Sequence, residues 1–429
     1  MYEIEPPAVY LHERALATPE GRARIERMLA HVRSPREPQV VDDARLNDLS
    51  LSRDWPIRGR RTGEHGRTGD PDLIFDAFTW DPPEVVRPRR ERYPGLAACM
   101  LDGAHPWTLR QGRDYYSARG TVCQTAWELH SAWGCLHRCD YCHVGGFLNI
   151  MVNLEELADR LRPFMAENPW LRLYKYDNQT DTIAFEPEYG ASALFVPFFA
   201  ATEDRFLMLY TKSDNVEHLM GLDHGGHTIV SFTISCPTTA REIEKATPDT
   251  ARRIAALARV QEGGYVPRVR FSPIVPLRDW REENEALIRD TLTAASPDVI
   301  SMDVLGWMNP DHLDTVLDAS LLDPRFLEAM RVLYRDGPPG PQYYPSSKHI
   351  FPHDLRVEVY TFFLDRVRAL DRHVRVALCN ETTDVWRELG PRLGMTPENY
   401  VCGCGPDSVP SNPLLAGARP RPAAGPAPA

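Results

Sequence analysis

Short apolar runs alternate with amphipathic stretches through the middle of the chain. Six runs have the length and apolar, aromatic character of strands, and they span 125–133, 171–176, 205–211, 228–235, 266–273 and 299–305. The stretches between them carry apolar residues at helical spacing, as Leu154, Leu157 and Leu161 do behind an Asn153 cap. Strands that alternate with helices predict parallel βα units. The pattern by itself is compatible with a barrel and with an open doubly wound sheet.

The segment before these runs, 1–120, is predicted to be an N-terminal extension. Thr18 and Pro19 are typical of a helix start, and 34–95 is interpreted as loop-rich. This part holds two groups of arginines, which we interpret as solvated surface, with contacts to phosphate as the alternative. The groups are Arg58, Arg60, Arg61 and Arg67, and Arg87, Arg89, Arg90 and Arg92.

The segments after these runs are less regular. The barrel-type region is predicted over 121–310, and a C-terminal α/β extension over 311–412. That extension is expected to hold helices at 353–370 and 382–389 around a strand at 374–379. The tail at 413–429 is rich in Pro and Ala and is expected to be disordered.

Composition narrows the class of protein. The chain has 429 residues, and 43% of them are hydrophobic, which suffices for a core. No apolar run is long enough to cross a bilayer, and the start lacks the features of a signal peptide, so neither a membrane span nor secretion is expected. Nine cysteines, an odd number with three clustered, favour a reducing cytoplasm over a disulfide framework. A net charge of −11 disfavours a broad nucleic-acid surface.

The three clustered cysteines carry the main chemical signal. Cys135, Cys139 and Cys142 are spaced C-x3-C-x2-C, directly after the first predicted strand. Cysteine thiolates hold iron–sulfur clusters, and three of them leave one iron of a [4Fe-4S] cluster open. That open iron can bind the amine and carboxylate of S-adenosylmethionine (SAM), a cofactor of radical chemistry. The alternative is a structural zinc site, with His137 or His143 as the fourth ligand.

The motif with its internal Tyr141 resembles the radical SAM superfamily, in particular its spore photoproduct lyase branch. The resemblance covers roughly 127–280, with a weaker echo at 378–381. It implies a partial (β/α)6 TIM-type barrel with N- and C-terminal extensions, and a site at the carboxyl ends of the strands. The further similar segments are Tyr210–Leu219, Asp223–Thr228, Ser231–Ser235 and Glu244–Pro248.

The resemblance also implies roles for individual residues. Tyr141 would lie near the cofactor. Lys212, at the end of the third strand, would contact the methionyl carboxylate of SAM. Thr233 and Ser235 are candidate hydroxyl contacts to SAM. The last group, Asn178 and the neighbouring Asp181, would bind the SAM amino group, although loop Asn and Asp residues commonly form turns.

Two positions depart from the pattern of the spore photoproduct lyases. His143 stands where those lyases have tyrosine. Tyr189, in Phe185-Glu186-Pro187-Glu188-Tyr189, stands where they have the cysteine that returns a hydrogen atom to the product radical. We therefore expect hydrogen return from Tyr189 itself, from Cys236 after the fourth strand, or from a Cys402/Cys404 loop folded over the barrel mouth. We also expect Tyr189 to reshape the pocket, so that spore photoproduct is poorly repaired.

These observations predict a cytoplasmic radical SAM enzyme that takes electrons from a reductant such as flavodoxin or ferredoxin. A small-molecule substrate is favoured, such as a sugar, a nucleoside or another intermediate of natural product biosynthesis that is epimerised or rearranged. A DNA photoproduct repair lyase is the first alternative, although a nucleic-acid partner is disfavoured. A non-enzymatic zinc-binding protein is the second alternative.

Overall fold

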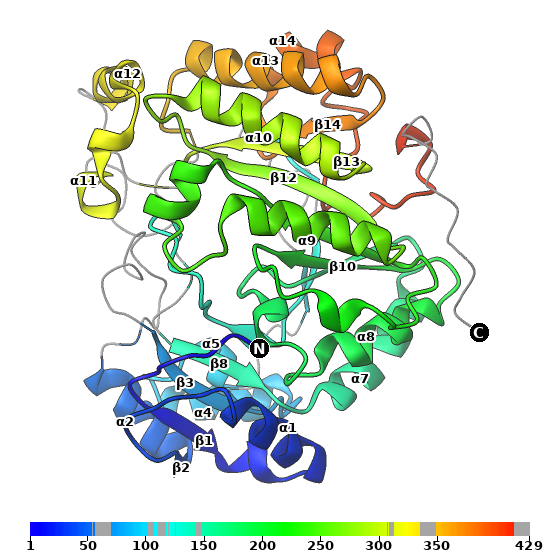
Figure 1. Ribbon diagram of the computed structural model, residues 1–429. Coiled ribbons are helices and arrows are strands. Elements are labelled where there is room, and N and C mark those ends of the chain that lie inside the picture. Colours follow the sequence, from blue (N-terminus) through cyan, green and yellow to red (C-terminus); the bar gives the residue numbers. More distant parts are fainter. Residues whose placement is uncertain are drawn as a thin grey trace.

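The computed structural model describes residues 1–53, 55, 70–101, 107–109, 117–118, 120–124, 126–142, 144, 147–306, 308, 313–334 and 349–415. Two sheets organise this part of the chain (Figure 1). A curled sheet of mostly parallel strands forms a partial barrel, and a smaller sheet lies beside it. Among the described residues, we find no helix with the length and hydropathy needed to cross a membrane.

The larger sheet confirms the predicted partial TIM-type barrel. Its strands follow the order β14-β13-β12-β11-β10-β9-β6-β4, and every neighbouring pair from β14 to β6 is parallel. The short edge strand β4 (Trp107–Leu109) runs antiparallel to β6. The seven parallel strands are β6 (Trp127–Leu129), β9 (Leu173–Tyr176), β10 (Phe206–Thr211), β11 (Thr228–Thr233), β12 (Val266–Ile274), β13 (Val299–Val304) and β14 (Arg375–Leu378).

The six runs predicted to be barrel strands all contribute to this sheet, and β14 adds a seventh parallel strand. The strand predicted at 374–379 therefore belongs to the barrel sheet and not to a separate extension. β14 pairs with β13 across a long intervening stretch of chain, from Val299↔Arg375 to Met302↔Leu378. Local periodicity identifies such a strand but contains no information about its partner.

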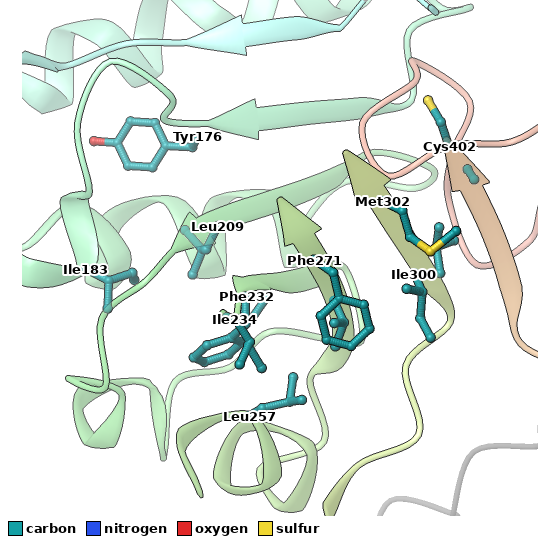
Figure 2. Packing of buried hydrophobic residues seen from close by; sticks show 14 of the residues in the cluster. Tyr176, Ile183, Leu209, Phe232, Ile234, Leu257, Phe271, Ile300, Met302 and Cys402 are labelled. Carbon is teal, nitrogen blue, oxygen red and sulfur yellow. The ribbon is translucent and has the colours of Figure 1, made fainter. Parts of the chain in front are cut away.

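Helices cover the outer face of the barrel sheet, as βα connections require (Figure 1). Outward-facing side chains, among them Leu209, Phe232 and Phe271, are buried beneath them with Leu257 of α9 (Figure 2). The main helices of the barrel and its C-terminal part are α7 (Leu154–Glu167), α8 (Ala191–Ala200), α9 (Thr250–Glu262), α10 (Trp280–Ala294), α13 (His353–Leu370) and α14 (Thr383–Leu393). The shorter elements are η2 (Thr182–Phe185), η3 (Glu217–Leu219), the π-turn η4 (Thr239–Ile243), α11 (Leu313–Val316), η6 (Ala319–Leu321) and α12 (Pro324–Tyr334).

The N-terminal part is more regular than predicted. Its sheet has the order β2-β1-β3-β8-β7, and it borrows β7 and β8 from the region assigned to the barrel. The strands are β1 (Val9–His12), β2 (Gln39–Val41), β3 (Asp72–Asp76), β7 (Ala132–Trp133) and β8 (Phe147–Met151). The helical elements are η1 (Glu13–Leu16), α1 (Pro19–Leu29), α2 (Asp43–Ser52), α4 (Pro83–Arg92) and α5 (Ala98–Leu101).

The helix start at Thr18 is confirmed, because the Thr18 hydroxyl caps α1 by accepting from Gly21 N (3.0 Å). The loop-rich interpretation of 34–95 is wrong where the chain is described. The strands there are very short, and β3 pairs with β8, which is distant in the sequence, so no local pattern marks them. Of the two arginine groups, the one at 58–67 lies outside the described residues. In the other, Arg89 pairs with Asp81 (2.6 Å).

The C-terminal segment closes the barrel at the end opposite to the one expected. Pro406 O accepts from the backbone N–H groups of Arg172 and Leu173 (2.9 Å each), where β9 begins. The Cys402/Cys404 loop therefore lies at the amino ends of the strands, and its expected position over the barrel mouth is wrong. The expected disorder of the tail does not begin at 413, because η7 (Pro413–Leu415) buries Leu415. A two-stranded pairing of β5 (Thr121–Val122) with β15 (Glu381–Thr382) completes the described fold.

Candidate active site

The cysteine motif lies on the loop between β7 and β8, at the junction of the two sheets. Gly134 begins this loop with φ of +96°, and a Cβ at this position would lie 2.0 Å from Phe147 O. Only glycine fits such a close approach of two backbones. The loop then docks on the turn after β11, where Asp140 N donates to Ile243 O (2.9 Å) and Cys139 forms a β-bridge with Glu244.

All three motif cysteines line one cavity of about 120 Å³. Burial raises the pKa of the Cys135 thiol, and Asp181 and the two neighbouring thiols raise it further. Three thiols that disfavour one another's ionisation are stabilised as thiolates by cationic iron. This donor set fits a cluster with three protein ligands. The complete lining is Cys135, His137, Cys139, Tyr141, Cys142, Val144, Asn178, Thr180, Asp181, Tyr210, Thr211 and Lys212.

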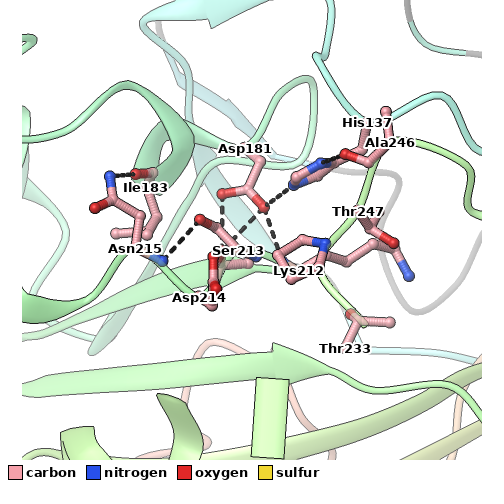
Figure 3. A network of polar contacts seen from close by, with 12 residues as sticks. His137, Asp181, Ile183, Lys212, Ser213, Asp214, Asn215, Thr233, Ala246 and Thr247 are labelled. Atoms are coloured by element: carbon pink, nitrogen blue, oxygen red, sulfur yellow. Dashed lines mark hydrogen bonds and ion pairs between the residues drawn. The ribbon is translucent and has the colours of Figure 1, made fainter. Parts of the chain in front are cut away.

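Asp181 fixes one side of the motif loop (Figure 3). Its carboxylate accepts from the Thr211 hydroxyl (2.8 Å), Lys212 N (2.8 Å) and His137 Nε2 (2.9 Å). The other ring nitrogen of His137, Nδ1, donates to Ala246 O (3.0 Å). Asp181 is thus engaged as an acceptor within the protein, so its predicted contact with the SAM amino group is not supported.

The zinc alternative loses its nearer candidate ligand through the same contacts. Both nitrogens of His137 are engaged, and neither is available to a metal ion. Within the described ranges, no three His, Cys, Asp or Glu side chains are placed to hold one metal ion. His143, the other candidate, lies outside the described residues, as does any consequence of its departure from tyrosine.

Glu244 fixes the other side of the site, and sequence reasoning assigned it no role. Its buried carboxylate accepts from Lys212 Nζ (2.8 Å), Ser235 Oγ (2.9 Å), Arg253 Nη1 (2.6 Å) and the Tyr141 hydroxyl. Burial alone would raise the pKa of Glu244, but the charges of Lys212 and Arg253 hold it well below its usual range. The only sequence signal was its place in the Glu244–Pro248 segment of the family resemblance.

The residues predicted to bind SAM mostly lie around this cavity. Lys212 lines it, with Nζ 5.7 Å from the centre of the Tyr141 ring. Asn178 lines it too; its Nδ2 donates to Glu128 (2.8 Å), while its buried Oδ1 has no partner among the described residues. Thr233 is buried at the end of β11, and Ser235 donates to Glu244. Their contacts with SAM stay predictions.

Two residues predicted to be catalytic lie outside the cavity. Tyr189 is fully buried, and its hydroxyl donates to the carbonyls of Met151 (2.8 Å) and Ser131 (3.1 Å). It ties the barrel to the N-terminal sheet and does not reshape the pocket. Cys236 is buried with its thiol 3.2 Å from the Thr239 hydroxyl. The strand positions suggested a site-facing role for both, but the chain direction after each strand turns them into the core.

Cys379 is a thiol that the sequence did not single out. Of the nine cysteines, all of which the structure describes, it alone outside the motif is partly exposed. It follows β14 at the carboxyl end of the sheet, and its Sγ lies 3.8 Å from Arg270 Nη2. The Arg270 guanidinium lies 5.1 Å from the centre of the Tyr210 ring, and Tyr210 lines the cavity. Cys379 is therefore two side chains away from the motif cysteines.

Comparison with known proteins matches residues 122–306 to the spore photoproduct lyase family model. The spore photoproduct lyase of Clostridium acetobutylicum is 23% identical over 170 residues, which cover 38% of this chain and 51% of that protein. That of a Geobacillus species is 22% identical over 158 residues, which cover 35% and 46%. The chain thus spans about half the length of the curated relatives it matches.

Solved structures extend the similarity of the fold. A cysteine mutant of spore photoproduct lyase with dinucleoside spore photoproduct superimposes with a TM-score of 0.61 at 16% identity, over 88% of this chain and 98% of that one. A double mutant with bound AdoMet and the same dinucleoside gives 0.58 at 15%, over 87% and 98%. Together the comparisons confirm the resemblance to the spore photoproduct lyase branch of the radical SAM superfamily and the partial-barrel fold. They indicate an enzyme of this type with a [4Fe-4S] cluster and SAM as cofactors.

Proposed function

We propose that this radical SAM protein, similar to spore photoproduct lyase, abstracts a hydrogen atom from a pyrimidine photoproduct or a related nucleoside. The observation that carries the proposal is the single cavity that joins Cys135, Cys139 and Cys142 to Lys212 and Tyr141. When bound, the cluster supplies one electron that cleaves SAM to methionine and a 5′-deoxyadenosyl radical. The chain's own residues hold the cluster, orient SAM and shield the cavity.

The three cysteines would hold the cluster, and Asp181 and Glu244 hold the loop that carries them. Lys212 is placed to bind a carboxylate of SAM. Its ammonium group has three donors, and Glu244 takes one of them, so two remain for a ligand. Tyr141 covers the cavity beside the cysteines, with its hydroxyl fixed by Glu244. These contacts preorganise the site and limit the entry of water.

The choice of substrate rests on a reversal of the sequence argument. A photoproduct lyase needs a hydrogen donor, and the replacement of cysteine by Tyr189 spoke against repair. Tyr189 lies in the core, and Cys379 supplies a thiol from the other end of the barrel sheet. The matched relatives are named as spore photoproduct lyases. Both considerations support the DNA-lesion alternative over our first expectation of a small-molecule substrate.

The substrate test is anaerobic turnover of dinucleoside spore photoproduct, and of the corresponding dinucleotide with its phosphodiester, with SAM and dithionite. Release of thymine nucleosides, together with 5′-deoxyadenosine, is the expected result. Formation of 5′-deoxyadenosine without any change in either lesion would favour the second candidate, a sugar or nucleoside enzyme of natural product biosynthesis. That candidate is favoured by the narrow cavity of about 120 Å³.

Lys212→Ala is expected to raise the Kd for SAM at least tenfold. A hydrogen bond to a charged partner contributes about 1.5–3 kcal/mol, and about 1.4 kcal/mol corresponds to a factor of ten. Equilibrium binding of SAM to the anaerobically reconstituted protein measures the effect. Arg241→Ala, whose side chain is exposed, is the control. An unchanged SAM affinity in the Lys212 variant would remove Lys212 from the SAM site.

Cys379→Ala is expected to form 5′-deoxyadenosine while losing product. In the proposed step, the Cys379 S–H bond breaks and a C–H bond forms on the product radical. The thiyl radical then returns to a thiol by taking one electron from a flavodoxin- or ferredoxin-type reductant and one proton. In heavy water, the wild-type product should carry one solvent deuterium. Cys402→Ala, at the amino end of the barrel, is the matched control, and equal product yield in both variants would exclude Cys379 as the donor.

A further inference from the structure

Arg270 differs from the other buried arginines of the described chain. Arg24, Arg253, Arg268 and Arg356 are all buried, and each pairs with a carboxylate within 3.2 Å. Arg270 is 8% exposed and forms no ion pair with any described residue. A buried charge without a counter-ion costs several kcal/mol. The position therefore calls for an anion that the described chain does not provide.

The surroundings of Arg270 are polar and incompletely satisfied. Its Nη2 is 3.3 Å from Ser272 Oγ, and that hydroxyl is 3.4 Å from Asp303, so the nearest carboxylate is reached only through serine. Among the described residues, Arg270 Nε has no hydrogen-bond partner, and neither do the buried hydroxyls of Ser231 and Ser301. Native proteins leave few buried polar atoms unpaired, so three in one region indicate a missing partner.

The sheet register places these groups on the inner face of the barrel. Arg270 lies directly opposite Thr233 on β11 and Ser301 on β13, and in-register neighbours of a parallel sheet share a face. The alternate residues Val269 and Phe271 belong to the outer hydrophobic core. Thr211 pairs with Phe232, so Lys212 is next to Thr233 in the same row. Arg270 thus lies in the barrel interior, behind Tyr210 as seen from the cysteines.

We propose that Arg270, with the hydroxyl of Ser301, binds an oxyanion of the substrate, either a carboxylate or a phosphate. This inference rests on the proposed function, because it assigns a charge to the substrate of the same site. The guanidinium offers a planar pair of donors that matches both oxyanions. Arg270 anchors the anionic end of the substrate, while the reacting C–H bond faces the cavity of the motif cysteines. For a dinucleotide lesion, the anion is its phosphodiester.

The test measures binding and requires no turnover. Inorganic phosphate and acetate are titrated at low ionic strength into the anaerobically reconstituted wild type, Arg270→Gln and the exposed control Arg289→Gln. We expect the Arg270 variant to lose at least tenfold in affinity for one or both anions, and the control to match the wild type. The anion that binds the wild type more tightly identifies the substrate group. Equal affinity in all three proteins would overturn the proposal.

Two further measurements distinguish substrate binding by Arg270 from SAM binding and from a structural role. SAM affinity should stay within about twofold of the wild type in Arg270→Gln, because removal of a charged hydrogen bond to SAM would weaken binding about tenfold or more. A parallel loss would show that Arg270 binds SAM instead. Arg270→Met should not lower the melting temperature, whereas Arg268→Met should, because it leaves Asp298 unpaired. A fall for Arg270→Met as large as that for Arg268→Met would show a structural role. Failure of the proposed function would instead appear as absence of 5′-deoxyadenosine in the wild type.

Discussion

Replacing Cys135, Cys139 and Cys142 together with alanine should remove the iron and sulfide and abolish formation of 5′-deoxyadenosine. The wild type, reconstituted without air, should contain about four irons and four sulfides per chain. The three thiols line one cavity, and within the described lining the nearest imidazole, His137, is held by Asp181 and Ala246. No substitute ligand is therefore at hand there when the thiols are removed, and the loss should be complete.

Iron and acid-labile sulfide per chain measure the first effect, and chromatography of the nucleoside products measures the second. The matched control is a triple variant in which Cys236, Cys402 and Cys404 are replaced by alanine. These cysteines lie in the core or at the amino end of the barrel, so the control should keep its full iron content. One zinc and no sulfide in wild-type protein purified without air would contradict the radical SAM assignment.

Glu244→Gln should destabilise the protein by about 3–5 kcal/mol, the range observed when one partner of a buried ion pair is removed. Glu244 is fully buried and neutralises both Arg253, which is equally buried, and Lys212. The amide keeps the shape of the side chain but carries no charge. Two cations would then share a site without a carboxylate, and the motif loop would lose the acceptor of Tyr141.

Urea denaturation of the cluster-free protein measures this effect without a contribution from metal binding. Glu217→Gln is the control, since Glu217 pairs with Arg259 on the surface, where ion pairs contribute little. The Glu244 variant should also retain less iron after reconstitution, because the loop that carries the cysteines docks on Glu244. A denaturation midpoint equal to that of the control would show that the four donors around Glu244 do not depend on its charge.

The part of the site that the sequence predicted is the part encoded within a few consecutive residues. The spacing of three cysteines specifies a ligand set, because residues so close in the chain stay close in space. The residues that position this set come from elsewhere, and Asp181 and Glu244 show the difference. Asp181 appeared as a loop residue with a role in binding SAM, whereas its contacts with Thr211, Lys212 and His137 make it an anchor of the motif loop.

The hydrogen donor shows the same limit in reverse. The family resemblance directed attention to Tyr189, because it stands where a cysteine was expected. The phenol points into the core between the two sheets, and the thiol of Cys379, far along the chain, reaches the barrel interior instead. Which face a side chain takes depends on strand pairing, and a displacement of one position moves a side chain from one face of a sheet to the other.

By itself, the sequence determined the cluster motif, the family resemblance and the six βα units of the barrel, since short-range spacing and hydrophobic periodicity encode all three. Only the tertiary structure decided that β14 closes the sheet, that β7 and β8 join the N-terminal part, and that Cys379 and Arg270 meet inside the barrel. The physical reason is that these features depend on hydrogen-bonded registers between segments that lie far apart in the sequence. Local propensity limits which segments form strands, but it does not select their partners.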